Sequence, residues 1–261
     1  MTFTILLGWA ILAGLFLVLF AYATAQRDAS VVDAGWGFGL AVLAVLYALI
    51  GEGEPAHRIL IGILAGLTGL KVGSYILVAR VIGKSEDGRY QTLRAKWGAR
   101  ANRRFFVFFQ GQAFLDVLLS VPFLLVAFNA SLGLEPLEYA GFTLWILATA
   151  GETLADRQLT RFRARPESKG RVCRDGLWRY SRHPNYFFQI LTWLAFALMA
   201  LAAPYGWIGL VAPLVITYSI LFVTGIPPTE AQALRSRGEA YRDYQRTTSA
   251  LVPWFPRKAQ A

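Results

Sequence analysis

The apolar residues of this chain gather in seven runs that are separated by short polar connections. Each run has roughly twenty residues, which is the length that an α-helix needs to cross the hydrocarbon core of a bilayer. This pattern predicts an all-α polytopic membrane protein with seven transmembrane helices. The runs lie at Thr4–Ala25, Val31–Ile50, Ile59–Ile82, Phe105–Phe128, Leu137–Gln158, Phe187–Ala203 and Trp207–Ile226.

The composition agrees with this prediction. Hydrophobic residues make up 56% of the 261 residues and charged residues 16%, whereas soluble domains contain roughly half and about a quarter. We therefore expect one integral-membrane domain over residues 1–261. The first apolar run has no basic segment before it, which favours a retained helix over a cleaved signal peptide.

Basic residues alternate along the chain. They are dense after the third, fifth and seventh apolar runs and sparse after the second, fourth and sixth, where Arg58 is the exception. By the positive-inside rule, the N-terminus lies outside and the C-terminus is cytoplasmic, which an odd number of spans allows. Because the net charge of +10 falls in loops between apolar runs, it does not indicate a nucleic-acid partner. No obligate protein partner is evident.

The chain lacks the residues that most metal and nucleotide sites require. Cys173 is the single cysteine, so neither a disulfide nor a thiolate metal site is expected. Two histidines are too few for a histidine metal cluster. No P-loop, GxGxxG or HExxH motif is present. A bound nucleotide would therefore have to be held by membrane helices and their loops.

The polar stretch Gly170–Phe187 is the most unusual part of the chain. Arginine forks suit phosphate, although basic side chains beside a membrane also contact lipid head groups. Pro184 disfavours helix at the residue before it, so the next helix should begin there. Its first turn would present Asn185, Tyr186 and Gln189, together with free N–H groups that favour an anion. The basic residues of the stretch are Arg171, Arg174, Arg179, Arg182 and His183.

Several ionisable side chains fall within apolar runs, where such groups usually face a protein interior. Asp33 and Asp156 lie near the ends of runs and alternatively reach interfacial water, and Trp36 alternatively belongs to an interfacial belt. Lys71 alternatively forms a buried ion pair with Asp116. The polar groups at helical spacing are Asp33 with Trp36, Lys71 with Tyr75, and Glu152 with Asp156.

Two further polar segments lie next to the membrane. The mixed-charge segment Ser85–Tyr90 is either a solvated loop or a cover over a bound polar ligand. In the tail, residues from Glu230 to Tyr244 recur at helical spacing, which predicts an amphipathic helix on the cytoplasmic face. Glu230 would accept hydrogen bonds from an amide or a ribose, or alternatively stabilise the helix dipole.

The stretch GLWRYSRHPNYF, the apolar helix after it and a tail of the form E…GxxYxxY…LVPWFP resemble the steroid 5α-reductase family. The segments VVDAGWG, SEDGRY and FFQG are similar to its bacterial branch, so the resemblance covers nearly the whole chain. The wider superfamily includes isoprenylcysteine carboxyl methyltransferases, which share a related C-terminal half.

The resemblance implies an NADPH-dependent reductase of the carbon–carbon double bond in a 3-oxo-Δ4 steroid or a related enone lipid. Hydride addition at C5 builds negative charge on the 3-keto oxygen, which a positioned donor must stabilise. It also implies a bacterial inner-membrane protein with its cofactor site facing the cytoplasm. Residues 1–130 would form mainly the substrate side and residues 137–256 mainly the cofactor-binding half.

The resemblance also implies roles for individual residues. Tyr75 matches the family tyrosine that hydrogen-bonds the steroid ketone. The second run has no counterpart of that tyrosine's glutamate partner, and either Asp33 or Glu86 takes its place. Gln189 stands where many relatives carry glutamate and would contact the nicotinamide amide. The full set expected to bind the cofactor is Trp36, Glu152, Asp156, Arg163, Arg171, Arg179, His183, Asn185, Tyr186, Gln189, Glu230 and Tyr244.

Two other function classes remain open. A membrane methyltransferase that uses S-adenosylmethionine would share the helical cradle, but its cofactor carries no phosphate. The arginine density therefore favours NADPH. A transporter or lipid-binding protein would have no affinity for either nucleotide.

Overall fold

The computed structural model describes residues 1–257, and within them every regular element is a helix. The all-α class is therefore confirmed. The chain forms two compact units: unit 1 comprises Met1–Pro136 and Met199–Ala212, and unit 2 comprises Leu137–Leu198 and the described part of Pro213–Ala261. The predicted single domain, with a substrate side and a cofactor half, stays a prediction.

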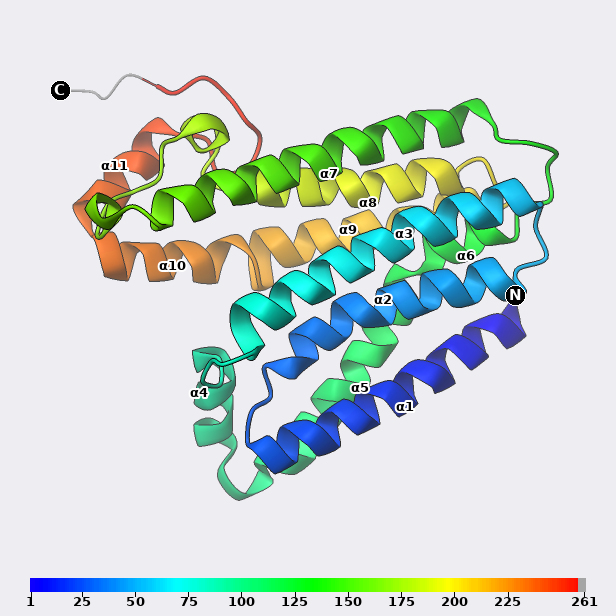
Figure 1. The fold of residues 1–261 in the computed structure, drawn as a ribbon, viewed down its shortest axis with the longest axis horizontal. Coiled ribbons are helices and arrows are strands. Elements are labelled where there is room, and N and C mark those ends of the chain that lie inside the picture. The colour runs from blue at the N-terminus through cyan, green and yellow to red at the C-terminus, as the bar shows by residue number, and fades with distance from the viewer. Residues whose placement is uncertain (258–261) are drawn as a thin grey trace. The chain divides into compact units, whose positions relative to one another are not determined.

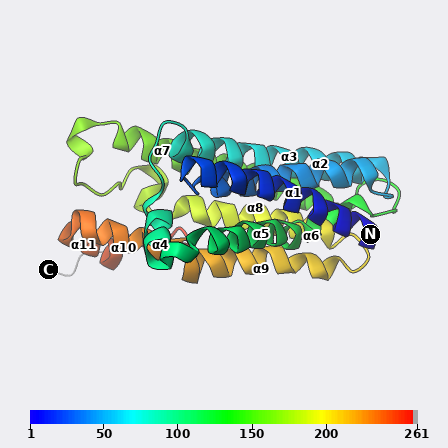
Figure 2. The same cartoon turned by 90° about the horizontal axis from the view of Figure 1, so that it is seen from below.

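Unit 1 is built from long helices that lie side by side (Figures 1 and 2). Helix α1 packs against α2 and α5, and α2 packs against α3. The short polar helix α4 lies at one end of these helices (Figure 1). The helices are α1 (Thr2–Gln26), α2 (Val31–Ile50), α3 (Pro55–Ile76) with the π-helical turn η1 (Leu77–Val81), α4 (Gly88–Trp97), α5 (Ala101–Leu119) and α6 (Val121–Ala127).

Small residues bring α2 and α3 into close contact. A Cβ atom added to Gly37 would lie 2.4 Å from the backbone nitrogen of Gly73. One added to Gly69 would lie 2.6 Å from the backbone nitrogen of Ala41. Small side chains at four-residue spacing are typical of helices that pack tightly within a bilayer, where van der Waals contact replaces the hydrophobic driving force.

The fourth predicted run, Phe105–Phe128, is not one straight helix. It is divided into α5 and α6, whose axes differ by 42°. Pro122 lies just after the break, where it lacks the N–H of the helical ladder and disfavours helix at the residue before it. The preceding polar connection contains α4, which begins where the Asp87 side chain accepts a hydrogen bond from the backbone N–H of Arg89.

Unit 2 contains the second half of the helices. Its C-terminal helices and the end of α7 gather at one end of the unit (Figure 1). Helix α7 lies against α8, since a Cβ atom added to Gly151 would be 2.3 Å from the Phe188 ring. The elements are α7 (Pro136–Arg163), the 3-10 turns η3 (Pro166–Ser168) and η4 (Gly176–Arg179), α8 (Pro184–Ala200), α9 (Val211–Tyr218), the π-helical turn η6 (Ser219–Val223), α10 (Ile226–Arg237) and α11 (Glu239–Thr247).

The prediction of one amphipathic tail helix is wrong. Gly238 adopts a positive φ of 52° and ends α10, and α11 follows directly. Positive φ is strained for side chains other than glycine, so this residue turns the chain between two short helices. Helix α11 then buries Tyr241 and Tyr244.

Four helices are long and apolar enough to cross a membrane within the described residues, or five if α4–α5 and α6 count as one bent span. These helices indicate an integral membrane protein. Helices α7 and α8 hold the fifth and sixth predicted runs but fall outside this set. Helix α8 has 17 residues, and α7 carries acidic residues along its length. The count of seven spans therefore stays a prediction. The four helices are Thr2–Gln26, Val31–Ile50, Pro55–Val81 and Gly206–Arg237.

Candidate functional site

The loop between α7 and α8 is attached to α7. Trp178 donates its Nε1–H to the carbonyl oxygen of Ala155 at 2.8 Å. The backbone N–H of Leu177 donates to Oε1 of Gln158 at 2.9 Å. Gly176, with φ of 53°, lies directly against the Gln158 side chain, where a Cβ atom would approach to 2.2 Å. These contacts fix the loop at the C-terminal part of α7.

The same loop is attached to α10 and α11. Arg237 donates its Nε–H to the carbonyl oxygen of Arg171 at 2.9 Å, and Arg174 pairs with Asp243 at 2.6 Å. The buried Tyr244 hydroxyl contacts the carbonyl oxygens of Trp178 and Ser181. Burial raises the pKa of Tyr244, so its hydroxyl stays a neutral donor. The hydroxyl group predicted to bind a cofactor therefore holds the loop in place.

Glu230, in the first turns of α10, accepts hydrogen bonds from three elements. Its Oε1 lies 2.7 Å from Nε of Arg182 and 3.2 Å from Nε2 of His183. Its Oε2 accepts from Nε2 of Gln245 at 2.7 Å. The Tyr241 hydroxyl lies 3.5 Å from Oε1. We call these five residues the Glu230 cluster.

The charge of Glu230 is stabilised by this cluster. The candidate span that contains it has 32 residues, more than the roughly twenty that a bilayer core requires, so its polar last turns lie beyond the hydrocarbon. Burial opposes ionisation of Glu230, but hydrogen bonds from His183, Arg182 and Gln245 outweigh that effect and lower its pKa to about 2. Glu230 is therefore a carboxylate at neutral pH.

Asn185 and Tyr186 join the start of α8 to α7 and α10. Asn185 donates its Nδ2–H to Oδ1 of Asp156 at 3.2 Å, and its Oδ1 accepts the backbone N–H of Tyr186 at 3.0 Å. The Tyr186 ring stacks on the His183 ring at 5.3 Å, and its hydroxyl lies 3.3 Å from Oγ1 of Thr229. The structure thus brings several of the predicted cofactor residues to one place in unit 2.

Other predicted cofactor residues lie near this place or apart from it. Glu152 and Gln189 lie one turn further along α7 and α8, at the level where Gly151 contacts Phe188. Trp36 lies on α2 in unit 1, outside the group that unit 2 forms.

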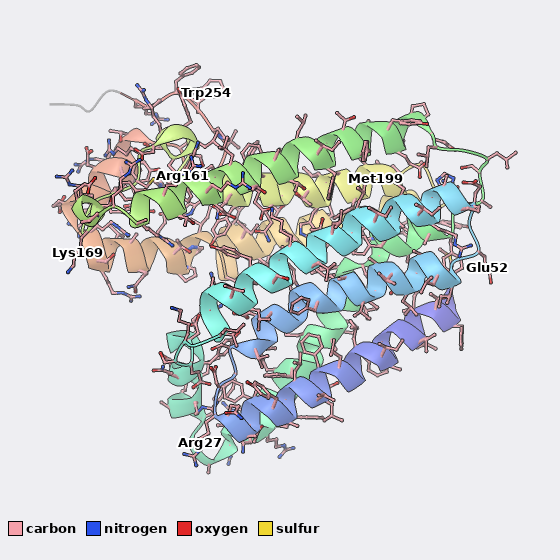
Figure 3. All side chains as sticks on the ribbon, in the orientation of Figure 1. Arg27, Glu52, Arg161, Lys169, Met199 and Trp254 are labelled. Atoms are coloured by element: carbon pink, nitrogen blue, oxygen red, sulfur yellow. The ribbon has the colours of Figure 1, made fainter. Side chains whose placement is uncertain are left out.

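The arginines near the loop fall into two classes. Within the described residues, the guanidinium groups of Arg163, Arg171 and Arg179 make no ion pair, and all three side chains are exposed. These are the three arginines predicted to bind the cofactor. The paired arginines are Arg165 with Asp175 at 3.0 Å, Arg174 with Asp243 at 2.6 Å and Arg182 with Glu230 at 2.7 Å. At this end of unit 2, Arg161, Lys169 and Trp254 mark its outer edge (Figure 3).

In unit 1, two predicted catalytic carboxylates are engaged by other side chains. Asp33 accepts from Nη2 of Arg89 and from the Tyr90 hydroxyl, each at 2.6 Å. Glu86 accepts from the backbone N–H of Ala29 at 2.9 Å and from Nη2 of Arg94 at 2.7 Å. The segment Ser85–Tyr90 is therefore folded against the connection between α1 and α2. Both acids serve as acceptors in this network.

Tyr75 differs from these two acids. It lies on the last turns of α3, and its side chain is 52% exposed. Its hydroxyl has no hydrogen-bond partner in the part of the chain that the structure describes. No hydrogen bond among the described residues joins it to Asp33 or Glu86. Of the three predicted catalytic residues, Tyr75 alone offers an unoccupied donor.

The alternative that Lys71 pairs with Asp116 is wrong. Asp116 is fully buried on α5, and neither of its carboxyl oxygens has a hydrogen-bond partner among the described residues. Oδ2 of Asp116 instead faces Gly39, where a Cβ atom would lie 2.3 Å away. An isolated carboxylate is costly in such surroundings, so Asp116 is held there as a neutral acid.

The sequence analysis did not include three members of the Glu230 cluster in the candidate site. Arg182 stood in the basic stretch with no indicated partner, and Tyr241 was assigned only to the face of a tail helix. Their spacing from Glu230 along the chain gives no local signal, and Gln245 gave none at all. Only the fold brings the starts of α8, α10 and α11 together.

The comparison with family models gives one match. The model described as "Protein of unknown function (DUF1295)" matches residues 19–248. Neither the comparison with curated proteins nor that with solved structures finds a match.

Proposed function

The chain belongs to the DUF1295 family, which includes steroid 5α-reductase-like members, and on this premise we propose that it is an NADPH-dependent enone reductase. It reduces the Δ4 double bond of a 3-oxo-Δ4 steroid, or of a related enone lipid, to the 5α product. The proposal is supported by the resemblance of GLWRYSRHPNYF and the tail motif, and by the arrangement of arginines in unit 2.

The observation that carries the proposal is the set of unpaired arginines. Arg163, Arg171 and Arg179 flank a loop that α7, α10 and α11 hold fixed, and their guanidinium groups make no ion pair within the described chain. Guanidinium forks bind phosphate oxygens in pairs, so these three residues fit the phosphates of NADPH. Asn185 and Asp156, already hydrogen-bonded to each other, would present amide and carboxylate groups to the nucleotide.

The chain's own catalytic task is to stabilise charge on the substrate carbonyl. When bound, NADPH would supply the hydride that is added at C5. The Tyr75 hydroxyl donates a hydrogen bond to the 3-keto oxygen, where negative charge develops before C4 takes up a proton. Asp33 and Glu86, which are engaged with Arg89 and Arg94, hold the segment beside α2 in place and do not polarise the carbonyl.

We further propose seven membrane crossings, with the N-terminus outside and the C-terminus cytoplasmic. The loop before α8 is hydrogen-bonded to α11, so the loop and the tail lie on one side of the membrane. Since the helix from Gly206 to Arg237 crosses once, α8 must also cross. The basic connections before α5 and after α7 belong on the cytoplasmic side, which requires α7 to cross as well. This places the arginines at the cytoplasmic face of a bacterial inner membrane.

NADPH binding by the detergent-purified protein tests the cofactor assignment. Replacing Arg179 by alanine should weaken binding about tenfold or more, because a charge-assisted hydrogen bond contributes roughly 1.5–3 kcal/mol. Arg165→Ala is the matched control: it is an arginine of the same loop whose guanidinium Asp175 occupies. The control should change the dissociation constant by less than about twofold, since exposed ion pairs contribute little. Equal binding by both variants and the wild type would remove these arginines from the site.

The methyltransferase alternative is an outcome of the same titration. Its cofactor, S-adenosylmethionine, carries no phosphate and has no use for three unpaired arginines. Binding of S-adenosylmethionine without binding of NADPH would replace the reductase proposal. Binding of neither nucleotide would favour a transporter or lipid-binding protein.

A further inference from the structure

The chain after α11 is not helical, yet it is firmly attached to unit 2. The backbone N–H of Arg182 donates to the carbonyl oxygen of Ser249 at 2.8 Å, and that of Trp254 donates to Tyr180 at 2.9 Å. The Ser181 hydroxyl donates to the carbonyl oxygen of Leu251 at 2.7 Å. We call residues 248–257 the tail segment. Its backbone runs beside the residues that immediately precede α8.

The tail segment presents large apolar side chains to the outside. Val252 is 55% exposed, Trp254 70% and Phe255 76%. Their directions are fixed, because the Phe255 ring lies edge-on to Tyr180 at 6.1 Å and to Trp254 at 6.5 Å. Trp254 projects away from the helices at the outer edge of unit 2 (Figure 3). Each such side chain gains roughly 1.5–3 kcal/mol when something covers it.

The position of the tail segment indicates what covers it. Its partner residues, Tyr180 to Arg182, lie directly before Pro184, where the apolar helix α8 begins. The exposed aromatic rings therefore lie at the level where the chain passes from a polar cluster into an apolar span. Tryptophan with other aromatic residues at this level is typical of the bilayer interface, where one end of the ring is apolar and the other is hydrated.

The charges beside the aromatic rings select a type of lipid. Arg257 ends the tail segment, is exposed, and its backbone N–H donates to Thr247 at 2.8 Å. Arg246 on α11 is also exposed, and its contact with Asp243 is long, at 3.7 Å. Guanidinium groups beside an apolar patch attract the anionic head groups of a leaflet by roughly 1 kcal/mol each.

We propose that the tail segment is a membrane-interface anchor: Val252, Trp254 and Phe255 insert among the head groups of an anionic leaflet, with Arg246 and Arg257 against lipid phosphates. The anchor is hydrogen-bonded to Tyr180–Arg182 and so holds the start of α8 at a fixed depth. This inference does not depend on the proposed reaction, because it rests only on exposure, attachment and charge.

The test is the depth of position 252 in the full-length protein, reconstituted in vesicles of phosphatidylcholine and phosphatidylglycerol. Val252→Cys keeps both aromatic rings and takes a fluorescent thiol label, while the buried native Cys173 gives the labelling background. Arg242→Cys, on an exposed position of α11, is the matched control. Nitroxide-labelled lipids should quench the label at position 252 at least about threefold more than the label at position 242, and aqueous iodide should show the reverse order.

Two comparisons decide the outcome. Replacing Trp254 and Phe255 by serine in the Val252→Cys protein should abolish most of the lipid quenching, and omitting phosphatidylglycerol should reduce it. Quenching of position 252 by iodide as strongly as position 242 would overturn the anchor. Protection from both quenchers would also overturn it, since another part of the protein would then cover the rings. Equal lipid quenching with and without phosphatidylglycerol would overturn the part played by the arginines.

Discussion

At the scale of single residues, Glu230 has the most connected side chain of unit 2. Its carboxylate oxygens accept from Arg182 at 2.7 Å and from Gln245 at 2.7 Å, and one lies 3.2 Å from His183. A carboxylate with several donors is well stabilised, whereas its donors depend on it for a counter-charge. Glu230 therefore positions the start of α8 and the end of α11 around the predicted cofactor residues.

Replacing Glu230 by glutamine should lower the stability of the protein by about 2–3 kcal/mol. The amide keeps the volume but leaves the largely buried Arg182 without its counter-charge, and such losses exceed those of exposed pairs. Thermal unfolding in detergent measures the effect. Glu239→Gln is the control, since its pair with Arg242 is exposed and should contribute less than about 0.5 kcal/mol. Similar midpoints for the two variants would contradict the role given to Glu230.

The same residue predicts a dependence of stability on acid. Glu230 has a pKa of about 2 in the folded protein against an ordinary value of 4.5. A carboxyl group whose pKa is lowered by folding stabilises the protein fully above its unfolded pKa and loses that contribution as the pH falls through its folded pKa. The stability gap between the wild type and Glu230→Gln should therefore be constant above pH 4.5 and shrink between pH 4.5 and 2. Unfolding midpoints over this range, with a gap that stays unchanged, would refute the lowered pKa.

At the scale of elements, the contact between α2 and α3 depends on the absence of side chains. Gly37 faces backbone atoms of Gly73, so nothing there can rotate away from an added methyl group. Gly66 is on the same helix as Gly73, but its nearest neighbour would be a Val45 methyl group at 4.0 Å. The two positions therefore separate close helix packing from the helix propensity of glycine.

Gly37→Ala should destabilise the protein by about 1–3 kcal/mol, because the two helices must separate to admit the methyl group. Gly66→Ala should be neutral or stabilising by up to about 1 kcal/mol, since alanine favours helix and meets only an ordinary contact. The measurement is the unfolding midpoint of each variant in one detergent. A Gly37→Ala protein as stable as Gly66→Ala would show that α2 and α3 are not in close contact.

Helix boundaries show how far the pattern of apolar residues reaches. The second run coincides with α2, and the first differs from α1 by two residues at one end and one at the other. Hydrophobicity reports which residues leave water, so it finds long spans well. It did not reveal the bend after Ser120, helix α4 or the turn at Gly238, because these depend on a proline, a capping aspartate and a positive φ.

The candidate site was less predictable than the spans. Asn185 and Asp156 were expected together and are hydrogen-bonded, since both lie near the ends of neighbouring helices. The occupied hydroxyl of Tyr244 and the engaged carboxylate of Asp33 were not foreseen. Those contacts join residues more than fifty positions apart along the chain, and only the folded backbone decides them.

At the scale of the whole molecule, the ends of the helices carry the topology. In unit 1, Arg27 and Glu52 lie at opposite ends (Figure 3). Arg27 lies at the end near the basic connection that contains α4, and Glu52 at the end where residues 51–53 are close to Ala127 and Asn129. Positive charge at one end and acid at the other agree with the proposed orientation.

Cysteine accessibility in oriented vesicles tests that orientation. Lys169→Cys, in the loop after α7, should react with a membrane-impermeant thiol reagent only in inside-out vesicles. Glu52→Cys should react only in right-side-out vesicles or whole cells. Both positions are exposed, and native Cys173 is buried. Reaction of both from the same side would show that α7 does not cross, and five spans would replace seven.

The measurement that tests the central claim most directly is NADPH oxidation by the detergent-purified protein in the presence of a 3-oxo-Δ4 steroid such as progesterone. Absorbance follows the cofactor, and mass spectrometry follows the steroid. The account predicts steroid-dependent loss of NADPH, a product two hydrogen atoms heavier than the substrate, and a large loss of turnover in Tyr75→Phe with NADPH binding unchanged. A protein that binds NADPH but leaves every enone lipid unreduced would contradict the reductase while preserving the cofactor site. A protein that binds no NADPH would contradict both.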